Sequence, residues 1–255
     1  MNRFPNGIKK PGFYQKDVDT TKIPAWLKTE KIYLDSNKDY INYLICNDKS
    51  TLLYMANLGC IELNPWNSTI QKVETPDWVV IDLDPEQIDF REVVKVALLV
   101  KNVLDELSVP CYCKTSGSTG LHVYVPLAAQ YDYETAKLFA KVVATEVNVR
   151  SPKTTSIVRA VQQRQQRVYI DYLQNSRVQT LAAPYSVRPK PGATVSAPLE
   201  WDEVNSTLSP AQFTINNMLK RISQKGDLWK PVLGKGIDLD KIIKGVSAHT
   251  GITQH

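Results

Sequence analysis

The sequence has 255 residues, of which 43% are hydrophobic and 22% charged, and its formal net charge is +5. These values are typical of a soluble globular protein with one large domain or two small ones. They exclude a membrane-spanning protein, because no apolar run approaches ~20 residues. The first ten residues contain no apolar signal-peptide core, so we expect a cytoplasmic protein with no membrane association.

The predicted elements mix strands and helices along the chain. Residues 1–30 show little periodicity and are expected to form an extended arm. Helical spacing of apolar residues predicts a long buried-face helix over 90–108, and Gly59 closes a short helix that starts at residue 50. Further strands are predicted over 31–36, 60–66, 78–85, 111–116, 121–127 and 167–173, and further helices over 133–147 and 213–222. This order favours a mixed α/β (α+β) domain over 1–230, with a central mixed or antiparallel sheet flanked by helices and a C-terminal tail over 231–255.

The four cysteines do not indicate a metal site. Cys111 and Cys113 share one face of a predicted strand, but only three histidines accompany the four cysteines in the whole sequence. A zinc site needs more ligands at suitable spacing. We therefore expect Cys111, Cys113, Cys46 and Cys60 to be buried, reduced thiols.

Two acids follow the apolar run of the predicted strand 78–85. Asp82 and Asp84 are two residues apart, so they point to the same side of the strand at a spacing of about 7 Å. Their like charges repel unless a cation lies between them, and Asp-x-Asp at a strand end is a common way to hold Mg²⁺ or Mn²⁺ beside a phosphate. The alternative is that both acids face water.

Two further groups of polar residues are candidates for the same site. The stretch "KTSGSTGLH", 114–122, contains a small, Gly-containing turn through which backbone N–H groups can approach an oxyanion, with Ser116 and His122 beside it. It lacks the spacing of a Walker motif. Asp171 lies inside an apolar strand, where an unpaired carboxylate is costly, so it is a candidate third metal ligand. The alternatives are a packed core histidine at position 122 and a structural salt bridge from Asp171 to Arg167.

Positive charge is concentrated in one part of the chain. Residues 150–190 contain eight Lys or Arg residues and a single acid, Asp171. This stretch therefore carries a net charge of +7, while the rest of the chain sums to −2. Such a distribution predicts a basic face that binds a polyanion, unless it is only a solvated surface.

Together, these features fit a nucleotidyl transferase that uses two metal ions. Three carboxylates would hold the ions, while Arg, Lys, Ser and His side chains would neutralise phosphate oxygens. A glycosyltransferase that uses nucleotide sugars also employs Asp-x-Asp with manganese, but it needs neither Asp171 nor the basic stretch. A third reading is a DNA-end binder without catalytic activity.

Four separate motifs resemble one family. The segments "RFPNGIKKPGFYQK", "WVVIDLDP", "KTSGSTGLHVYVPL" and "YIDYLQNSRVQTLAAPYSVRPKPGATVSAPLEWDEV" are similar in order and spacing to the polymerase domain of bacterial and archaeal ligase D. That domain belongs to the archaeo-eukaryotic primase superfamily. The resemblance extends from about Arg3 to about Leu228.

The resemblance implies specific roles for individual residues. Three carboxylates, Asp82, Asp84 and Asp171, match the catalytic metal ligands, which hold two Mn²⁺ or Mg²⁺ ions. Matches to nucleotide-binding positions are Phe13, Tyr14, Asn64, Ser116, His122, Arg164, Arg167, Gln174, Arg188 and Lys190. Asn175 matches a further position next to Gln174, and the lysines expected to bind DNA are Lys9, Lys10 and Lys16.

The sequence also departs from the family pattern. Asn64 stands where better-known members carry a His, Thr119 replaces a Lys of the Gly-containing loop, and Lys190 replaces the second Arg of the triphosphate clamp, which loses a bidentate fork. Members commonly carry a longer segment before "RFPNG", including groups that grip a downstream 5′-phosphate. Since Met1 lies two residues before this motif, we expect only a weak dependence of DNA binding on that phosphate.

The resemblance implies an activity and partners. The expected activity is template-directed addition of nucleotides, with ribonucleotides preferred, to DNA 3′ ends at breaks or gaps in non-homologous end joining. The expected partners are primer-template DNA, nucleoside triphosphates, and the end-joining proteins Ku and ligase. A primase that starts chains de novo is the alternative within the same class.

Overall fold

The computed structural model describes residues 1–34, 38–239 and 241–242. Its main element is a six-stranded sheet with the strand order β11-β7-β8-β6-β10-β9. These strands are β6 (Trp78–Pro85), β7 (Tyr112–Thr115), β8 (Leu121–Pro126), β9 (Thr155–Ser156), β10 (Val168–Asp171) and β11 (Pro198–Leu199). All neighbours pair antiparallel except β9 and β10, which are parallel. The predicted mixed α/β class is confirmed.

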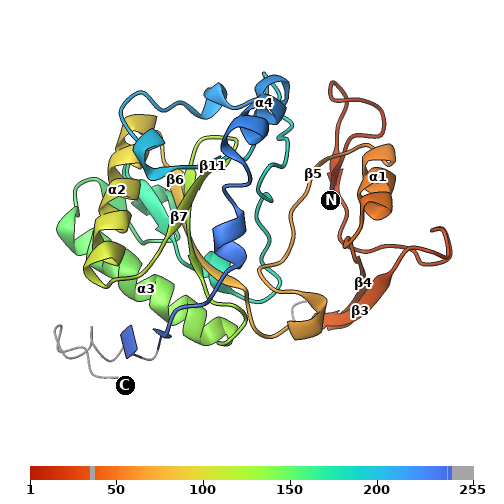
Figure 1. Ribbon diagram of the computed structural model, residues 1–255, viewed down its shortest axis with the longest axis horizontal. Coiled ribbons are helices and arrows are strands. Elements are labelled where there is room, and N and C mark those ends of the chain that lie inside the picture. Colours follow the sequence, from red (N-terminus) through yellow and green to blue (C-terminus); the bar gives the residue numbers. More distant parts are fainter. Residues whose placement is uncertain (35–37, 240, 243–255) are drawn as a thin grey trace.

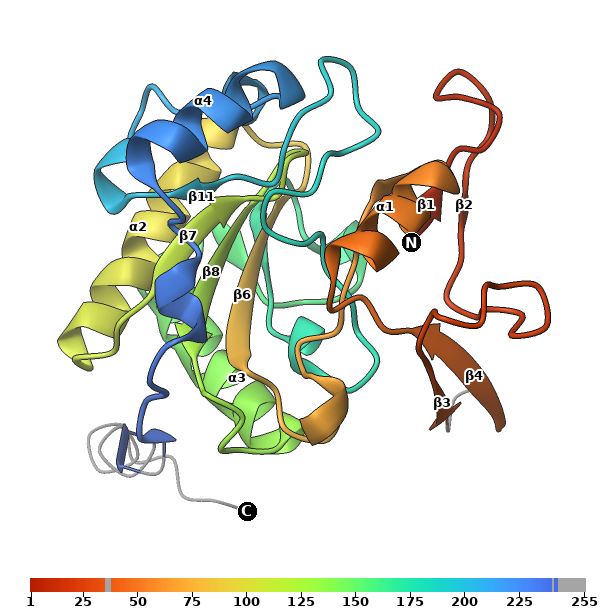
Figure 2. The ribbon, with the colours of Figure 1, turned by 45° about the vertical axis from the view of Figure 1, so that its right-hand side comes forward.

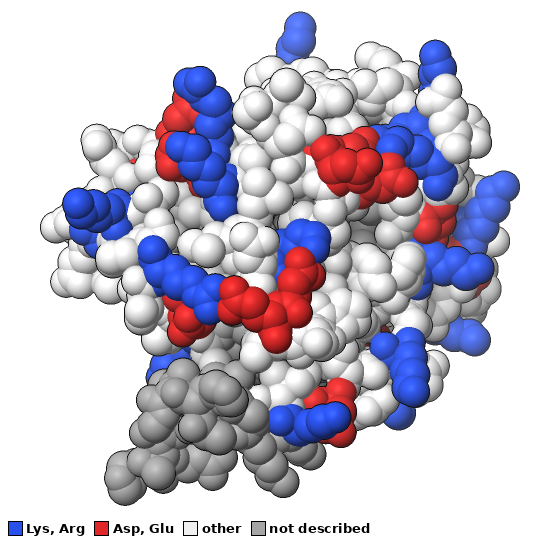
Figure 3. Space-filling model, turned by 60° about the vertical axis from the view of Figure 1, so that its left-hand side comes forward, with Lys and Arg blue, Asp and Glu red and all other residues white. Residues whose placement is uncertain are grey.

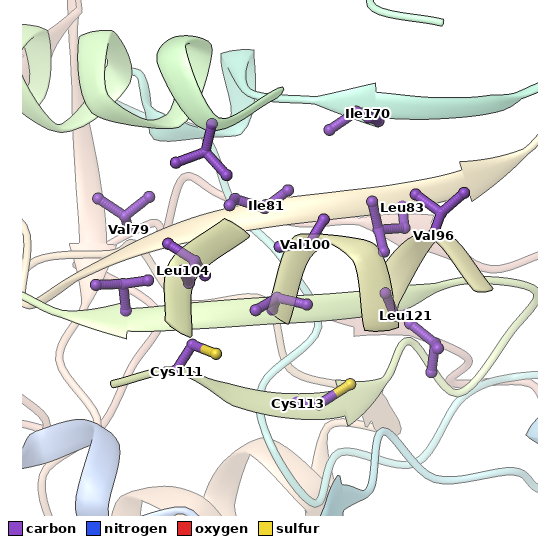
Figure 4. Packing of buried hydrophobic residues seen from close by; sticks show 14 of the residues in the cluster. Val79, Ile81, Leu83, Val96, Val100, Leu104, Cys111, Cys113, Leu121 and Ile170 are labelled. Atoms are coloured by element: carbon purple, nitrogen blue, oxygen red, sulfur yellow. The ribbon is translucent and has the colours of Figure 1, made fainter. Parts of the chain in front are cut away.

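Two long helices cover one face of this sheet. They are α2 (Phe90–Glu106) and α3 (Tyr133–Arg150), and each begins at an Asp whose side chain accepts a hydrogen bond from a backbone N–H of the first turn. Alternate residues of β6, including Ile81 and Leu83, pack against the apolar stripe of α2 (Figure 4). Because side chains alternate along a strand, the residues between them point to the opposite face.

The opposite face of the sheet is divided into an apolar half and a polar half. Val80 and Tyr124 pack there against Trp229 and Val232, next to the short helix η6 (Lys230–Leu233). Asp82 follows Val80 by two residues on β6, and His122 precedes Tyr124 by two residues on β8. Both side chains are also buried but are polar. The polar half of this face is where the candidate site lies.

Residues before β6 form a separate layer beside the sheet (Figures 1 and 2). This layer contains a three-stranded sheet of order β2-β1-β5 and the hairpin β3-β4. Its elements are β1 (Asn2–Arg3), β2 (Phe13–Tyr14), β3 (Thr29–Leu34), β4 (Asp39–Leu44), α1 (Lys49–Asn57), β5 (Cys60–Glu62) and η1 (Ile70–Lys72). The segment expected to be an extended arm is thus anchored by strand pairing, and the Met1 ammonium donates to the carbonyl of Gln15.

The remaining elements are short, apart from one helix after the sheet. They are η2 (Val161–Gln163), η3 (Leu173–Asn175), η4 (Trp201–Glu203), η5 (Pro210–Gln212) and α4 (Ile215–Lys225). Part of the segment expected as a tail packs on the core, since Leu239 is fully buried and Ile237 N–H donates to the carbonyl of Pro126. Residues 240 and 243–255, and residues 35–36 of the predicted strand 31–36, lie outside the described part.

The structure tests the expectations that the cysteines are buried thiols and that no helix spans a membrane. Cys111 and Cys113 are buried and all four thiols are free, but Cys46 is exposed and Cys60 only half-buried. The prediction of burial was wrong for these two because they lie in the layer outside the main core. No helix among the described residues is long and apolar enough to cross a membrane.

Candidate active site

The register of the sheet places four polar side chains, one lysine, one histidine and two aspartates, in one row. Lys114 of β7 is opposite His122 of β8, His122 is opposite Asp82 of β6, and Asp82 is opposite Asp171 of β10. Residues directly opposite one another in paired strands share a face and have close Cβ atoms. The row therefore brings two of the three predicted metal ligands together, and Asp84 adds the third on the same face of β6.

The acids of this row repel one another in a buried setting. Burial raises the pKa of Asp82 well above its ordinary value, and the nearby carboxylates of Asp84 and Asp171 raise it further. Burial also raises the pKa of Asp84, with Asp171 adding to the effect and Arg164 opposing it. A cluster with this property needs a positive partner before all its members can ionise.

One oxygen of Asp82 is free to meet such a partner. His122 Nε2 lies 3.2 Å from Asp82 Oδ1, but the approach is too far off line for a hydrogen bond, and Oδ1 has no hydrogen-bond partner in the described residues. Asp171 is more occupied, because its carboxylate accepts from Tyr169 OH, Leu173 N–H and Gln174 Nε2. Within the described ranges, no three His, Cys, Asp or Glu side chains already converge on one ion-sized point.

Asp171 does not form the structural salt bridge considered as an alternative. Its partners are uncharged, and Arg167 instead donates to Gln165 Oε1. Arg164 lies closer to the acids: its guanidinium stacks over Tyr169 at 3.7 Å from the ring centre and is 3.9 Å from Glu86. Of the two arginines, Arg164 is therefore the one placed beside Asp84.

The loop between β7 and β8 is shaped by Ser116. Its Oγ accepts hydrogen bonds from the backbone N–H groups of Ser118 and Gly120, which leaves its own O–H proton free to donate. Gly117 has a φ of +70°, and a Cβ there would meet the side chain of Arg188. Two N–H groups of the loop are thus used internally, and Ser116 becomes the polar group that the loop presents.

His122 is buried beside Lys114 and Asp82, in a setting that favours a neutral ring. Burial lowers its pKa well below the ordinary value, and Lys114 and Arg188 lower it further. Its Nδ1 lies 2.9 Å from Lys114 Nζ. A neutral ring offers one hydrogen-bond donor and one acceptor and no positive charge, so the predicted contact of His122 with phosphate would be a hydrogen bond.

Arg188 connects the loop to the layer of residues before β6. Its Nε lies 3.0 Å from Glu62 Oε2, and its NH1 donates to the carbonyl of Ser116. Glu62 Oε1 also accepts from Tyr14 OH and from Asn64 Nδ2. Glu62 was not predicted as a site residue; a buried acid at the end of a short strand was the only signal that could have found it.

The two aromatic residues of β2 point to opposite sides, because side chains alternate along a strand. Phe13 lies against the Arg3 guanidinium, whereas Tyr14 contacts Glu62. Both rings are exposed, at 46% and 65% respectively. Only Tyr14 is therefore tied to the group that holds Arg188.

Of the other predicted residues, Gln174 contacts the row, whereas the lysines are exposed and Asn64 lines a separate cavity. Lys190 is exposed, as are Lys9, Lys10 and Lys16. A cavity of about 420 Å³ is lined by Asn64, Lys16 and Trp66, among others, and by none of the three acids. Gln174 bonds Asp171, while Asn175 exchanges two hydrogen bonds with the backbone of Val80, a structural role that fixes η3 to β6.

The basic stretch 150–190 does not form one continuous basic face. Arg150 pairs with Glu106 and Glu146, and Arg177 pairs with Glu74. Figure 3 shows Lys and Arg side chains interspersed with Asp and Glu on the face it presents. The sequence could not reveal this, because the partner acids come from distant segments.

Comparisons with known proteins agree on one family. A family model described as "LigD, primase-polymerase domain" matches residues 1–229. The bifunctional non-homologous end joining protein LigD of Bacillus subtilis is 34% identical over 88% of this chain and 36% of its own length. The multifunctional LigD of Mycolicibacterium smegmatis is 30% identical over 94% of this chain and 31% of its own length. The chain thus spans about a third of the length of these relatives.

A solved structure gives the same result. The polymerase domain from Mycobacterium tuberculosis ligase D, in complex with DNA, superposes with a TM-score of 0.82 at 28% identity, over 92% of this chain and 84% of that one. The resemblance expected from four short motifs is confirmed, and the chain belongs to the LigD primase-polymerase domain family.

Proposed function

We propose that this protein is a metal-dependent nucleotidyl transferase that extends DNA 3′ ends at breaks or gaps under the direction of a template. The observation that carries the proposal is the row across the sheet, in which Asp171 is opposite Asp82 and Asp84 lies on the same face. Carboxylates gathered on one face of a sheet are the groups that can hold the two metal ions of such a transfer.

The residues present fit a divalent cation. Asp82 Oδ1 is a buried oxygen with no hydrogen-bond partner in the described part of the chain, and the three carboxylates repel one another without a positive partner. Asp82, Asp84 and Asp171 would hold Mg²⁺ or Mn²⁺, two per site. When bound, these ions activate the 3′-hydroxyl and stabilise the charge that develops on the phosphate.

The residues around the acids suit a triphosphate. Ser116 has a free hydroxyl proton, His122 is a neutral donor, and Arg188 can exchange its bond to Glu62 for one to a phosphate oxygen, which is charge-assisted. Arg164 adds a cation beside Asp84. Tyr14 is exposed next to Glu62 and can stack on a base.

DNA as substrate and end joining as process are supported by the relatives. The solved relative was determined in complex with DNA, and the curated relatives carry non-homologous end joining in their names. Ku and ligase are the partners that this role implies. Preference for ribonucleotides rests on the family resemblance of the sequence motifs.

A primer-extension experiment tests the proposal. The protein is incubated with Mn²⁺, a labelled primer-template and each ribo- or deoxyribonucleoside triphosphate in turn, with a chelator in the control. Template-dependent extension, faster with ribonucleotides, is the expected result. Unprimed oligomers would indicate a primase instead, and binding without any product would contradict a polymerase function.

A further inference from the structure

Lys114 is a buried lysine on the polar face of the sheet that sequence reasoning did not identify as a site residue. It is fully inaccessible to solvent, and among the described residues it forms no salt bridge. A buried ammonium without an anionic partner is costly unless its hydrogen bonds are satisfied. The arrangement of its hydrogen bonds therefore shows what the lysine does.

Three acceptors surround the Lys114 ammonium. Its Nζ lies 2.6 Å from Ser196 Oγ, 3.0 Å from the carbonyl oxygen of Ala182 and 2.9 Å from His122 Nδ1. Ser196 Oγ donates its own proton to the carbonyl of Thr115, so it can only accept from Lys114. An ammonium has three N–H donors and no acceptor, and this environment uses all three.

This geometry determines which nitrogen of His122 carries the proton. Because an ammonium can only donate, Nδ1 must present its lone pair to Lys114, and the ring proton must then be on Nε2. On its other side the ring turns Nε2 toward Asp82 Oδ1 at 3.2 Å without a hydrogen bond between them, so the Nε2 proton stays available to another acceptor.

We propose that Lys114 is a positioning residue that holds His122 in the Nε2–H tautomer, so that the ring presents a hydrogen-bond donor to the phosphate oxygens of the incoming nucleotide. The consequence for nucleotide use rests on the proposed function, whereas the tautomer itself does not. A neutral ring in the other tautomer would present a lone pair to the same oxygens and would repel them. Lys114 therefore acts on the nucleotide through His122 without touching it.

The tautomer can be measured directly in the full chain without metal or nucleotide. Burial lowers the pKa of Lys114 to about 7, so a spectrum at about pH 6.5 observes the lysine mainly charged. The protein is labelled with ¹⁵N in its histidine rings, and long-range ¹H–¹⁵N spectra separate protonated from unprotonated ring nitrogens. The chain has only three histidines, and the spectrum of His122→Gln assigns the signals of His122.

The expected spectrum shows an unprotonated Nδ1 and a protonated Nε2 for His122. A protonated Nδ1, or averaging between the two tautomers, would overturn the proposal. Because this readout involves no polymerase chemistry, it tests the tautomer even if the protein extends no primer. It also needs no variant at position 114, so a protonated Nδ1 in the wild type overturns the proposal even if Lys114→Met fails to fold.

A matched pair of variants tests the consequence for catalysis. Lys114→Met keeps the length of the side chain and removes its donors, while Lys101→Met removes the same charge from α2, on the other face of the sheet. Lys114→Met is expected to lose the fixed tautomer and to raise the nucleotide KM roughly tenfold, as for loss of a hydrogen bond to a charged group, with an unchanged Kd for DNA. Lys101→Met should change neither. A Lys114→Met protein that keeps the Nε2–H tautomer and a normal KM would show that Lys114 is only structural.

Discussion

The row on the six-stranded sheet and the cluster around Glu62 hold charged groups in different ways. In the row, strand pairing places Asp82, Asp171 and His122 side by side and keeps the two acids together, although burial strengthens their repulsion. Around Glu62, opposite charges attract, and the partners come from chain segments more than a hundred residues apart. Among the described residues, the acids of the row still lack a positive partner, whereas Glu62 already has one in Arg188. Substitutions of the three acids should therefore affect mainly chemistry, whereas substitutions of Glu62 and Arg188 should affect both stability and nucleotide use.

The largest effect is expected at the three acids. Asp82→Ala, Asp84→Ala and Asp171→Ala should each reduce primer extension by more than about a hundredfold, the upper range for losing even an outer-shell partner of a metal. DNA binding should change little, because it does not depend on these carboxylates. Primer extension and fluorescence anisotropy measure the two quantities. Asp89→Ala, at the exposed N-cap of α2, is the control, and near-normal extension by Asp171→Ala would remove Asp171 from the site.

Arg188 should combine a kinetic and a structural effect. Arg188→Ala removes a charge-assisted bond to phosphate and is expected to raise the nucleotide KM by about tenfold or more. It also leaves the buried Glu62 carboxylate without its cation, which should cost about 3 kcal/mol in the free energy of unfolding. Urea denaturation measures the second quantity.

The double variant separates these two effects. Glu62→Gln combined with Arg188→Ala removes the stranded charge, so it should recover much of the stability but none of the nucleotide affinity. Equal stability of the single and double variants would mean that Glu62 does not depend on Arg188. A normal KM in the double variant would place Arg188 away from the nucleotide.

The sequence predicted the row better than the cluster, for a physical reason. Asp-x-Asp after an apolar run and Asp171 inside another one are local patterns of period two, and a sheet with fixed register converts them directly into one site. Glu62 carries no such pattern, because its role depends on Arg188 and Tyr14 arriving from elsewhere. Lys114 was hidden for a related reason: its three acceptors become visible only when β7, β8 and the segment around Ser196 are assembled.

The predictions of secondary structure and surface charge show the same difference between local patterns and features that depend on tertiary structure. Strongly periodic elements such as β6 and α2 were predicted to within a few residues, while strand β4 (Asp39–Leu44) and the strand pairing within residues 1–30 were missed. The strands β1 and β2 have only two residues each, too few for a period to be recognised. The predicted basic face likewise ignored acids such as Glu74 and Glu106, which tertiary structure brings against it.

A further effect is expected in the pH dependence of stability through Lys114. Burial lowers its pKa from 10.5 to about 7, so between these values the unfolded chain binds a proton that the folded chain does not. Stability then rises with pH, by at most about 1.4 kcal/mol per pH unit. Urea denaturation from pH 7 to about pH 10 should show wild type gaining relative to Lys114→Met. A relative loss over this range would mean that the folded protein does not depress the pKa of Lys114.

The smallest effect is expected at Asn64. Its Nδ2 donates to Glu62 Oε1 at 3.0 Å, so it reaches Arg188 only through Glu62, and Asn64→Ala should cost roughly 1 kcal/mol of stability with little kinetic change. Asn64→His places a ring that protonates between about pH 6 and 8 beside that carboxylate. The protonated ring competes with Arg188 for Glu62 and so frees Arg188 to bind phosphate. The rate of extension by Asn64→His should therefore rise by about two- to threefold as the pH falls. Asn64→Ala should show no such trend. Steady-state extension rates of both variants across this range measure the difference. Identical pH profiles for the two would mean that position 64 is not coupled to the clamp, and Glu62 would then hold Arg188 independently of its neighbour.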